Sequence, residues 1–236
     1  SVCAICGSAL RMIQNGYAGV DENHPLTLGH EISGVIDQVG KHVKGYKPGM
    51  RVSIAPNFGC GICSQCVKGD THLCNQYQAF GINIDGGFAE YVRVPAAAIQ
   101  QGNVFPLPDQ VSMEDAALFE PFSCVINGQE QVQIKKNDWV LIIGSGPIGA
   151  MHAMLAQTSG AAKVFVYDIP HQRMEECIRA VKFAIPIEGS DLESEVFKLT
   201  NGRGMDVCIP ACSSQRAQEQ ALSLVGSGGR VLFFGG

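Results

Sequence analysis

The sequence contains no run of 18 or more apolar residues, no long basic stretch and no charged leader at its start. Without such an apolar run a transmembrane helix is not expected, and without a leader a signal peptide is not expected. The net charge of −5, together with the missing basic stretch, argues against a nucleic-acid surface. We therefore expect a cytoplasmic protein with no membrane and no nucleic-acid partner.

Charged residues are also scarce, at 17 %, and neither internal repeats nor low-complexity segments interrupt the chain. Hydrophobic residues make up 46 % of the 236 positions, which is typical of a globular protein and not of a disordered one. This length suffices for one large domain or for two ordinary ones.

The ten cysteines would predict a disulfide framework in a short secreted chain. This chain is long and has other means of building a core, so metal ligands and buried thiols are expected instead. The cysteines that lie in apolar or strand-like surroundings, and that we predict to be buried, inert thiols, are Cys124, Cys177, Cys208 and Cys212.

One short loop carries four further cysteines, Cys60, Cys63, Cys66 and Cys74. The first three are separated by two residues each, and the fourth follows after seven more. Cys-x-x-Cys spacing lets two thiolates reach one ion from a tight turn, and four thiolates complete a tetrahedral zinc shell with no open position. The loop therefore predicts a structural zinc site, which stabilises the fold and takes no part in chemistry.

Residues 1 to about 110 are rich in glycine, proline and short alternating apolar runs. Period-two alternation bounded by glycine and proline predicts short antiparallel strands, here at residues 32–39, 51–55 and 89–94. This half is expected to be a small β-barrel with loops.

After Pro121 strands and helices alternate strictly. Residues 122–133 predict a helix that links the two halves, and residues 139–143 predict a parallel strand buried on both faces. Further helices are predicted at 148–158, 172–180, 192–199 and 217–225, and further strands at 163–167, 183–187, 206–209 and 230–234. The alternation predicts an α/β fold with a doubly wound parallel sheet. We place the two domains at residues 1–122 and 123–236.

A glycine-rich turn joins the buried strand 139–143 to the next helix. Gly144, Gly146 and Gly149 form a G-x-G-x-x-G pattern, with Pro147 and Ile148 at the helix start. The first glycine makes the tight turn, the second lets a pyrophosphate approach the backbone, and the third allows close packing of helix and strand. Backbone N–H groups at the helix start would then face the phosphates of a dinucleotide.

Asp168 ends the next predicted strand, 19 residues after Gly149. A carboxylate at this place accepts hydrogen bonds from the ribose hydroxyls of the adenosine and repels a 2′-phosphate, so we expect NAD in preference to NADP. Arg173 leaves NADP open, because a nearby arginine can accommodate that phosphate. Asp168 could also serve only as a strand-end or cap residue.

Three separate segments hold further residues of metal-ligand type, namely Cys6, the pair His30 and Glu31, and Glu120. Each has an ordinary structural explanation by itself. A single cysteine is usually a core residue, a single histidine is usually hydrogen-bonded, and a glutamate before proline often begins a helix. Their spacing along the chain does not join them.

Several motifs together resemble the medium-chain, zinc-dependent alcohol dehydrogenases, and within them the polyol branch that includes sorbitol dehydrogenase. The resemblance covers essentially the whole chain. The motifs that carry it are Cys-Gly-Ser at 6–8, Gly-His-Glu at 29–31, the four-cysteine loop, Asp-Gly-Gly-Phe-Ala-Glu-Tyr at 85–91, Glu-Pro at 120–121 and the glycine-rich turn.

The resemblance implies that Cys6, His30 and Glu120 face a catalytic zinc, with Glu31 as a neighbouring or alternative ligand. It implies two zinc ions per chain, one catalytic and one structural. A thiolate, an imidazole and a carboxylate leave one coordination position open for substrate. The implied reaction transfers hydride from a secondary alcohol, a polyol or sugar derivative, to the nicotinamide of NAD and gives the ketone. Ser8 is expected to accept the hydroxyl proton.

The family also implies a GroES-like catalytic barrel beside a Rossmann domain, with the substrate cleft between them, and a homo-oligomer, either a dimer or a tetramer. Residue 1 corresponds to a point inside the catalytic domain, and the chain stops after the fifth Rossmann strand. We therefore expect both domains to be truncated and the chain to be a fragment or the ordered part of a longer protein.

Two residues depart from the family pattern. Ala9 stands where the family usually has an aspartate that orients a ligating histidine, and loss of such a partner typically costs ~10–100-fold in metal affinity or activity. Arg11 stands where many members carry a histidine that ends a proton relay, and an arginine does not shuttle protons at neutral pH.

Other functions stay open on these grounds. Within the same class, the closest alternative is a threonine-type or aliphatic secondary-alcohol dehydrogenase. In another class, a non-catalytic, zinc-stabilised nucleotide-binding protein would keep the four-cysteine loop and the glycine-rich turn unchanged. A zinc-free reductase is disfavoured, because such proteins generally lack both the four-cysteine loop and the Gly-His-Glu motif.

Overall fold

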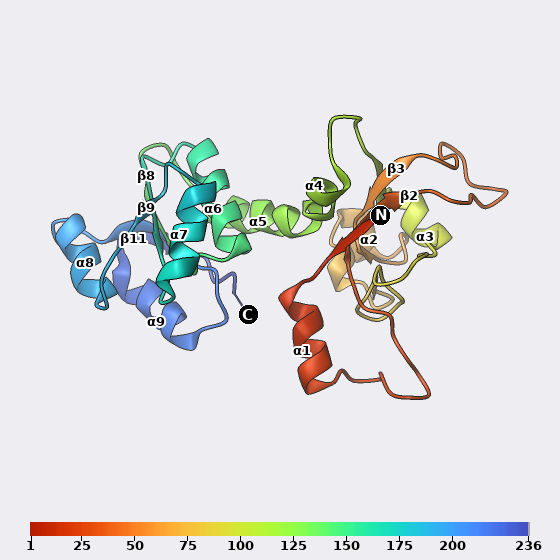
Figure 1. The fold of residues 1–236 in the computed structure, drawn as a ribbon, viewed down its shortest axis with the longest axis horizontal. Coiled ribbons are helices and arrows are strands. Elements are labelled where there is room, and N and C mark those ends of the chain that lie inside the picture. The colour runs from red at the N-terminus through yellow and green to blue at the C-terminus, as the bar shows by residue number, and fades with distance from the viewer. Residues whose placement is uncertain (236) are drawn as a thin grey trace. The chain divides into compact units, whose positions relative to one another are not determined.

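The computed structural model describes residues 1–235, which form two compact units that divide after Pro121 (Figure 1). Among these residues, no helix combines the length and the apolar character needed to cross a membrane. Each unit has a sheet and a hydrophobic core of its own. The assignment of zinc chemistry to the first unit and of dinucleotide binding to the second remains a prediction from the sequence.

The second unit is built on a five-stranded parallel sheet with the order β11-β10-β7-β8-β9. The strands are β7 (Trp139–Ile143), β8 (Lys163–Tyr167), β9 (Ile185–Pro186), β10 (Met205–Pro210) and β11 (Val225–Val231). The first strand in the sequence lies at the centre, and the strand order reverses direction there. The doubly wound parallel sheet predicted from the alternation of strands and helices is confirmed.

Helices cover both faces of this sheet, because side chains of a strand alternate between its two faces. The helices are α5 (Phe119–Val132), α6 (Pro147–Thr158), α7 (His171–Ala180), α8 (Leu192–Leu199) and α9 (Gln215–Leu224). On one face, Val140 and Ile142 pack with Ala153 of α6 and Cys177 of α7. On the other face, Leu141 packs with helices α8 and α9. The continuous apolar run of β7 is therefore buried from both sides.

The last strand differs from its prediction at residues 230–234. It begins at Val225 and ends at Val231, and its register against β10 shifts between Met205 and Val207. Glycines within it, with Gly228 at φ +75°, allow the irregular backbone that this shift requires. The sequence pattern placed the strand later because these glycines resemble a turn.

The first unit contains a four-stranded antiparallel sheet with the order β1-β2-β3-β6. The strands are β1 (Val2–Ala4), β2 (Glu31–Val35), β3 (Arg51–Ile54) and β6 (Val104–Pro106), and a short antiparallel pair joins β4 (Asn57–Phe58) to β5 (Gln78–Ala79). A small core of Ile32, Ile54, Phe58, Phe80 and Ala98 fills this unit. The predicted antiparallel strands near residues 32 and 51 are confirmed, although β2 ends earlier than expected.

The strand predicted at residues 89–94 is wrong, because these residues form no strand pairing within the described chain. Alternation predicts a strand only where a neighbouring strand is available to accept its hydrogen bonds. The segment just before it is held instead by isolated backbone hydrogen bonds. Examples are those from the Gly86 amide to the Thr27 carbonyl and from the Phe88 amide to the Leu28 carbonyl.

Short helices in the first unit were not predicted from the sequence. They are α1 (Gly7–Asn15), α2 (Ser64–Lys68), the 3-10 turn η1 (Thr71–Leu73), α3 (Ala96–Gln100) and α4 (Met113–Ala117). Their lengths, mostly one turn or slightly more, leave too little periodicity for detection. Helix α1 ends before Gly16, which takes φ +74°.

The four cysteines predicted to be buried have different surroundings. Cys177 and Cys208 are buried, Cys212 is partly buried, and Cys124 is exposed. The prediction for Cys124 was therefore wrong. Helix α5 carries this residue on a face that the second unit's core does not cover, and its apolar neighbours in the sequence lie on other faces of the helix.

Candidate metal centres and dinucleotide site

The four-cysteine loop brings its sulfurs together by folding around two short helices. Cys63 is the N-cap of α2, Cys66 lies inside that helix, and Cys74 follows the 3-10 turn η1. The ligand atoms of all four cysteines lie within 4.8 Å of one another. Two sulfur pairs are closer, with Cys63 Sγ at 3.5 Å from Cys66 Sγ and at 3.8 Å from Cys74 Sγ. Zn–S bonds of about 2.3 Å place tetrahedral sulfurs ~3.8 Å apart, so the loop suits a zinc ion.

Backbone N–H groups point at these sulfurs, as expected for thiolate ligands. The amides of Cys60 and Gln76 each donate to Cys74 Sγ at 3.3 Å, and the amide of Cys63 donates to Cys60 Sγ at 3.4 Å. Amide donation, first from Ile62 and then from Cys63, lowers the pKa of Cys60 to about 6. Burial, by contrast, raises the pKa of Cys66 to about 11. A bound cation would be required to keep the Cys66 sulfur ionised near neutral pH.

Neighbouring residues fix the start of this loop. The side-chain amide of Gln101 donates to the Gly59 carbonyl at 2.8 Å, and its oxygen accepts from the Gly59 amide at 3.3 Å. A Cβ on Gly59 would lie 2.5 Å from Cys66 Sγ, so only glycine permits this approach. The buried Asn103 side chain donates to the carbonyls of Ala55 and Asn57 at 2.9 and 2.7 Å. These contacts tie the loop to the core of the first unit.

A second cluster of ligand atoms is formed by Cys6, His30 and Glu31, which also lie within 4.8 Å of one another. Cys6 is the N-cap of α1, while His30 directly precedes β2 and Glu31 is the first residue of that strand. Strand β1 pairs with β2, with Ala4 opposite Glu31, and this pairing brings the two segments together. His30 and Glu31 are 8 % and 5 % exposed, so their polar atoms need partners inside the unit.

Glycines pack tightly around the residue before His30. Gly29 has φ +98°, and a Cβ there would lie 2.7 Å from both Cys3 Sγ and the Phe88 ring. A Cβ on Gly86 would lie 2.1 Å from the Gly29 carbonyl oxygen, and one on Gly81 would lie 2.5 Å from it. The amide of Gly87 donates to that same oxygen at 2.8 Å. The direction of the His30 backbone is therefore set by backbone packing that excludes any side chain.

The charges of this second cluster depend on one another. A hydrogen bond with His30 lowers the pKa of Cys6, and the same contact with Cys6 raises the pKa of His30. Burial raises the pKa of Glu31, and the charge of Glu120 raises it further. A thiolate, an imidazole and a carboxylate in this arrangement form the mixed donor set that zinc accepts.

The buried ring nitrogen of His30 supplies a test of this fit. His30 Nδ1 has no hydrogen-bond partner among the described residues, and a buried polar atom without a partner is costly. A histidine that ligates a metal normally uses both ring nitrogens, one on the metal and one on an acceptor. The donor set of the cluster fits a metal ion, but the acceptor that would orient the His30 ring is missing. Ala9, only 2 % exposed, has no polar side chain to provide it.

Ser8 and Glu120 lie near the cluster in different ways. Ser8 Oγ is 3.4 Å from Cys6 Sγ, so its hydroxyl is next to the candidate ligand set. Glu120, in the first turn of α5, is half-buried and affects Glu31 and His30 through its charge. The three residues with mutually close ligand atoms thus include Glu31, and Glu120 stands outside that group of three.

In the second unit, the glycine-rich turn has the shape that its sequence predicted. Gly144 takes φ +108°, and a Cβ there would lie 3.1 Å from Cys212 Cβ. A Cβ on Gly149 would lie 2.0 Å from the Gly144 carbonyl oxygen, so that glycine serves packing. Around Gly146, by contrast, nothing lies within 4 Å of such an atom. Gly146 is the N-cap of α6 without a side-chain cap, and Pro147 and Ile148 follow it. Its open side leaves room for a phosphate.

Asp168 lies directly after β8 and faces the glycine-rich turn. Its Oδ2 accepts hydrogen bonds from the amide and the hydroxyl of Ser145 at 2.8 and 2.9 Å, and its Oδ1 accepts one from the amide of Ile169 at 2.8 Å. A carboxylate offers about four acceptor sites, so capacity remains for a ligand hydroxyl. Asp168 therefore has a structural role in this turn, and its role toward a ribose stays a prediction.

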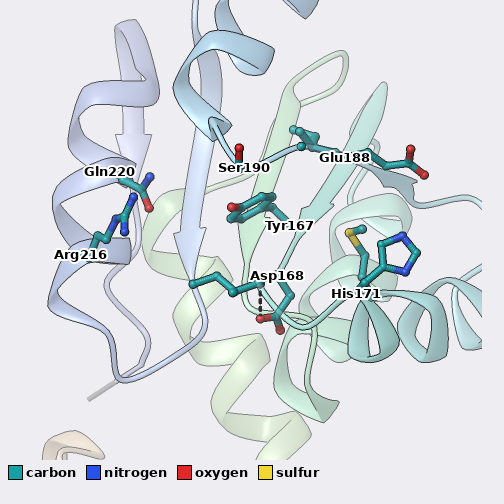
Figure 2. A pocket seen from close by; sticks show the side chains of 11 residues that line it. Tyr167, Asp168, His171, Glu188, Ser190, Arg216 and Gln220 are labelled. Atoms are coloured by element: carbon teal, nitrogen blue, oxygen red, sulfur yellow. Dashed lines mark hydrogen bonds between the residues drawn. The ribbon is translucent and has the colours of Figure 1, made fainter.

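An open cavity of about 410 Å³ lies beside Asp168 (Figure 2). Tyr167 and Asp168 line it from the carboxyl end of β8, and Arg216 and Gln220 line it from α9. Arg173, which the sequence suggested for a 2′-phosphate, is exposed on α7 and is not part of this lining. Sequence reasoning missed Arg216. Arg216 lies in the first turn of α9, the helix that follows β10. This position could have indicated a ligand contact, because ligands of such sheets bind outside the carboxyl ends of the strands.

Comparisons with known proteins agree on one family. The model of the alcohol dehydrogenase GroES-like domain matches residues 1–109, and the model of the zinc-binding dehydrogenase domain matches residues 147–236. Sorbitol dehydrogenase of Bacillus subtilis (strain 168) is 35 % identical over 235 residues, which cover 98 % of this chain and 65 % of that protein. L-threonine 3-dehydrogenase of Marinomonas sp. (strain MWYL1) is 32 % identical over 237 residues, which cover 100 % of this chain and 68 % of that protein.

A solved structure from Sinorhizobium meliloti 1021, described as a zinc-binding dehydrogenase bound to NADP, has the same fold. It aligns with a TM-score of 0.86 at 30 % identity, covering 99 % of this chain and 67 % of that one. The chain described here thus spans about two thirds of the length of these relatives. The likeness confirms the fold expected from the sequence, a GroES-like domain followed by a Rossmann domain.

The two glycines of the turn allow a matched prediction. Gly149→Ala should lower the free energy of unfolding by about 1–3 kcal/mol, because its Cβ meets the Gly144 carbonyl. Gly146→Ala should leave that free energy within about 0.5 kcal/mol and weaken dinucleotide binding, since its Cβ enters the open side of the turn. Urea unfolding and a fluorescence titration with NADH measure the two effects. Equal stability losses in both variants would contradict this division.

The four-cysteine loop yields a second prediction. Cys63→Ser should release one zinc ion per chain and lower the unfolding temperature by roughly 10 °C, because a structural metal contributes folding free energy. Val67→Ser, at a 75 % exposed position of the same helix, is the control and should change neither quantity. Metal analysis and thermal unfolding provide the measurement, and an unchanged zinc content in Cys63→Ser would remove the structural assignment.

Proposed function

Because the chain belongs to the medium-chain zinc-dependent alcohol dehydrogenase family, we propose that it is a zinc-dependent oxidoreductase. Its reaction transfers a hydride from the carbinol carbon of a secondary alcohol to a nicotinamide dinucleotide and yields the ketone. The observation that carries this proposal is the cluster of Cys6, His30 and Glu31, whose ligand atoms meet within 4.8 Å in a largely buried place. A scaffold protein would have no need for such a cluster.

The proposed catalytic metal site uses residues of the first unit only. Cys6 and His30 supply a thiolate and an imidazole, and a carboxylate from Glu31 or Glu120 completes the protein ligands. A zinc ion supplies Lewis acidity when bound, so that an alcohol hydroxyl ionises nearer to neutral pH. Ser8, whose hydroxyl oxygen is 3.4 Å from Cys6 Sγ, is placed to accept the hydroxyl proton and pass it to solvent.

NAD is the proposed electron acceptor. The Asp168 carboxylate stands beside the cavity of the second unit, where it would accept bonds from ribose hydroxyls and repel a 2′-phosphate. Arg216 in the same cavity, together with the relative that binds NADP, keeps NADP as the alternative. The turn of Gly144, Gly146 and Gly149 would hold the pyrophosphate through backbone N–H groups.

The proposed substrate is a polyol or a sugar derivative. The carboxylate at Glu120 supports this choice by analogy, because the simple-alcohol branch usually has a cysteine there. A threonine-type enzyme is the nearest rival, since the sorbitol and threonine dehydrogenases are 35 % and 32 % identical to this chain. The four-cysteine loop would hold a second, structural zinc, and we propose a cytoplasmic homo-oligomer, a dimer or a tetramer, as the family resemblance implies.

One observation favours a second candidate, a zinc-stabilised nucleotide-binding protein without catalysis. His30 Nδ1 is buried without a partner, and Ala9 does not provide the expected carboxylate. Such a protein would bind a single zinc ion in the four-cysteine loop. Two zinc ions per chain, of which one leaves without unfolding, would support the enzyme instead.

The metal ligand Cys6 gives a direct test. Cys6→Ser should reduce alcohol oxidation at least about 100-fold, because loss of a ligand exceeds the effect of losing a residue behind one. Binding of NAD should persist, since the second unit is unchanged. Cys124→Ser, at an exposed cysteine, is the control and should retain activity. Rates of NADH formation and calorimetric binding of NAD give the two readouts, and continued turnover in Cys6→Ser would refute the mechanism.

The choice of dinucleotide depends on Asp168. Asp168→Ser should raise the Kd for NAD and shift the ratio of kcat/KM between NAD and NADP toward NADP by about 10–100-fold, because repulsion of the 2′-phosphate is removed. The substitution should also lower the free energy of unfolding, since Asp168 accepts two hydrogen bonds from Ser145. Steady-state kinetics with both dinucleotides provides the measurement. An unchanged preference would mean that Asp168 only holds the turn.

A further inference from the structure

The interior of the second unit holds a histidine that the proposed chemistry does not use. His152, near the middle of α6, is completely buried, and its Nε2 atom has no hydrogen-bond partner among residues 1–235. Its Nδ1 atom lies 3.1 Å from the side-chain Nε2 atom of Gln129 on α5, whose Oε1 atom is likewise buried without a partner. Buried polar atoms without partners destabilise a fold, so this pair requires an explanation beyond packing.

A backbone carbonyl fixes the direction of the Gln129 amide. Its Nε2 atom also donates to the carbonyl oxygen of His152 at 2.8 Å. Turning the amide over would bring its oxygen against that carbonyl oxygen, and two acceptors repel each other. The amide nitrogen therefore faces the ring, so the Nδ1 atom of His152 must accept, and the neutral imidazole then carries its proton on Nε2.

An imidazolium does not fit between the same partners. Protonation makes both ring nitrogens donors, so Nδ1–H would face the N–H groups of Gln129 and Nε2–H would lack an acceptor. With the amide turned over, the Gln129 oxygen could accept from Nδ1–H only by facing the His152 carbonyl. In agreement with this geometry, burial lowers the pKa of His152 to about 4. Protonation thus requires α5 and α6 to move apart at this contact.

No charge from the surrounding elements acts on this ring, because burial is the only cause of its pKa shift. Strand β7 contains no ionisable side chain, and on α7 only Cys177 faces the core, where burial raises its pKa and keeps the thiol neutral. On α5, Glu120 lies in the first turn at the far end of the helix, and Glu130 is exposed. Lys163 on β8 is exposed, and Arg230 on β11 is already in an ion pair.

The imidazole also holds the segment that follows β11. Phe234 makes a T-shaped contact with the His152 ring, with 4.5 Å between the ring centroids and 85° between the ring planes. The same phenyl ring meets α5, where a Cβ on Gly128 would be 3.0 Å from a Phe234 ring atom. Phe234 is thus packed against both of the helices that the contact between Gln129 and His152 joins.

The residue after Phe234 leads to the glycine-rich turn. The Gly235 amide donates to the Pro210 carbonyl at 3.0 Å, and a Cβ on Gly235 would be 2.3 Å from the Cys212 carbonyl oxygen. Cys212 in turn lies against Gly144, the first glycine of the turn, where a Cβ would be 3.1 Å from Cys212 Cβ. Release of Phe234 would therefore loosen the backbone that packs on the turn.

We propose that Gln129 and His152 form an acid-sensitive latch: the neutral pair closes α5 and residues 232–235 onto α6, and protonation of His152 opens this contact and weakens the support of the glycine-rich turn. The pKa of the imidazole is about 6.5 in an unfolded chain and about 4 in the folded unit. The latch therefore stabilises the fold fully above pH 6.5 and loses this effect as the pH falls toward 4. Only the consequence for dinucleotide binding rests on the proposed function.

Nitrogen NMR of the full chain reads the latch directly, and His152→Leu identifies the signal by its loss. At pH 7.5 the ring should be neutral with its proton on Nε2, and it should titrate below pH 5, where amide exchange in α5 and α6 should rise. Gln129→Leu should raise the midpoint of this titration by roughly one pH unit, because the donor that opposes Nδ1–H is removed. A proton on Nδ1 at pH 7.5, or an unchanged midpoint in Gln129→Leu, would overturn the proposal.

Urea unfolding at several pH values measures the effect on stability, with the single tryptophan, Trp139 of β7, as the fluorescent probe. From pH 7.5 to pH 5.0, the equilibrium constant for unfolding should rise about 30-fold more in the wild type than in His152→Leu. His171→Gln removes an exposed histidine of α7 and should follow the wild type. Equal profiles for the wild type and His152→Leu would rule the latch out.

Calorimetric binding of NAD separates the latch from the proposed function. Between pH 7.5 and pH 4.0, the Kd for NAD should rise about twofold more in the wild type than in His152→Leu, because half of the wild-type latches are open at the lower pH. An equal rise in both proteins would refute the link to the glycine-rich turn. If NAD binds at neither pH while the ring titrates and α5 opens as described, the proposed function fails and the latch stands.

Discussion

The first unit depends on one backbone constraint, the close packing around the Gly29 carbonyl. Gly81 and Gly86 lie so close to that oxygen that a Cβ on either would clash with it, and the amide of Gly87 donates a hydrogen bond to it. This packing fixes the entry into β2, and the next two residues are His30 and Glu31. The geometry of the candidate metal site is thus set by peptide groups, whose positions vary less than those of side chains. The Asp-Gly-Gly-Phe motif is explained by this contact more than by any chemistry of its own.

The two candidate metal sites differ in how the protein supports them. In the four-cysteine loop, backbone amides donate to Cys60 and Cys74, and Gln101 and Asn103 hold the flanking backbone. In the cluster of Cys6 and its neighbours, the ring nitrogen that would normally bind an acceptor has none. Loss of a supporting hydrogen bond typically costs about 10–100-fold in metal affinity or activity. We therefore expect the first site to hold a zinc ion more tightly than the second.

The sequence predicted the second unit far better than the first. Strand β8 and helix α8 have the predicted bounds, because a buried parallel strand and an amphipathic helix carry long, regular patterns. Residues 89–94 failed as a strand, since pairing depends on a partner that local sequence does not reveal. In the candidate site, motifs identified Cys6, His30 and Glu31, but only coordinates could show that Glu31 is the closer carboxylate and that Arg11 folds back over Gly7. Arg216 escaped notice because its proximity to Asp168 is a property of the sheet order.

The central position of β7 has a consequence for how the chain acquires its fold. Val140 pairs with Val164 on one side and with Val207 on the other, so the middle strand of the sheet completes its hydrogen bonds only when a segment far along the chain arrives. Non-local pairing of this kind slows folding, because closing a long loop costs conformational entropy before the stabilising contacts form. During synthesis, β7 can therefore pair with β8 on one side, but its other side stays unpaired until β10 has left the ribosome. Until then, the unpaired edge of β7 is open to pairing with another strand, so misfolding of the second unit can start there.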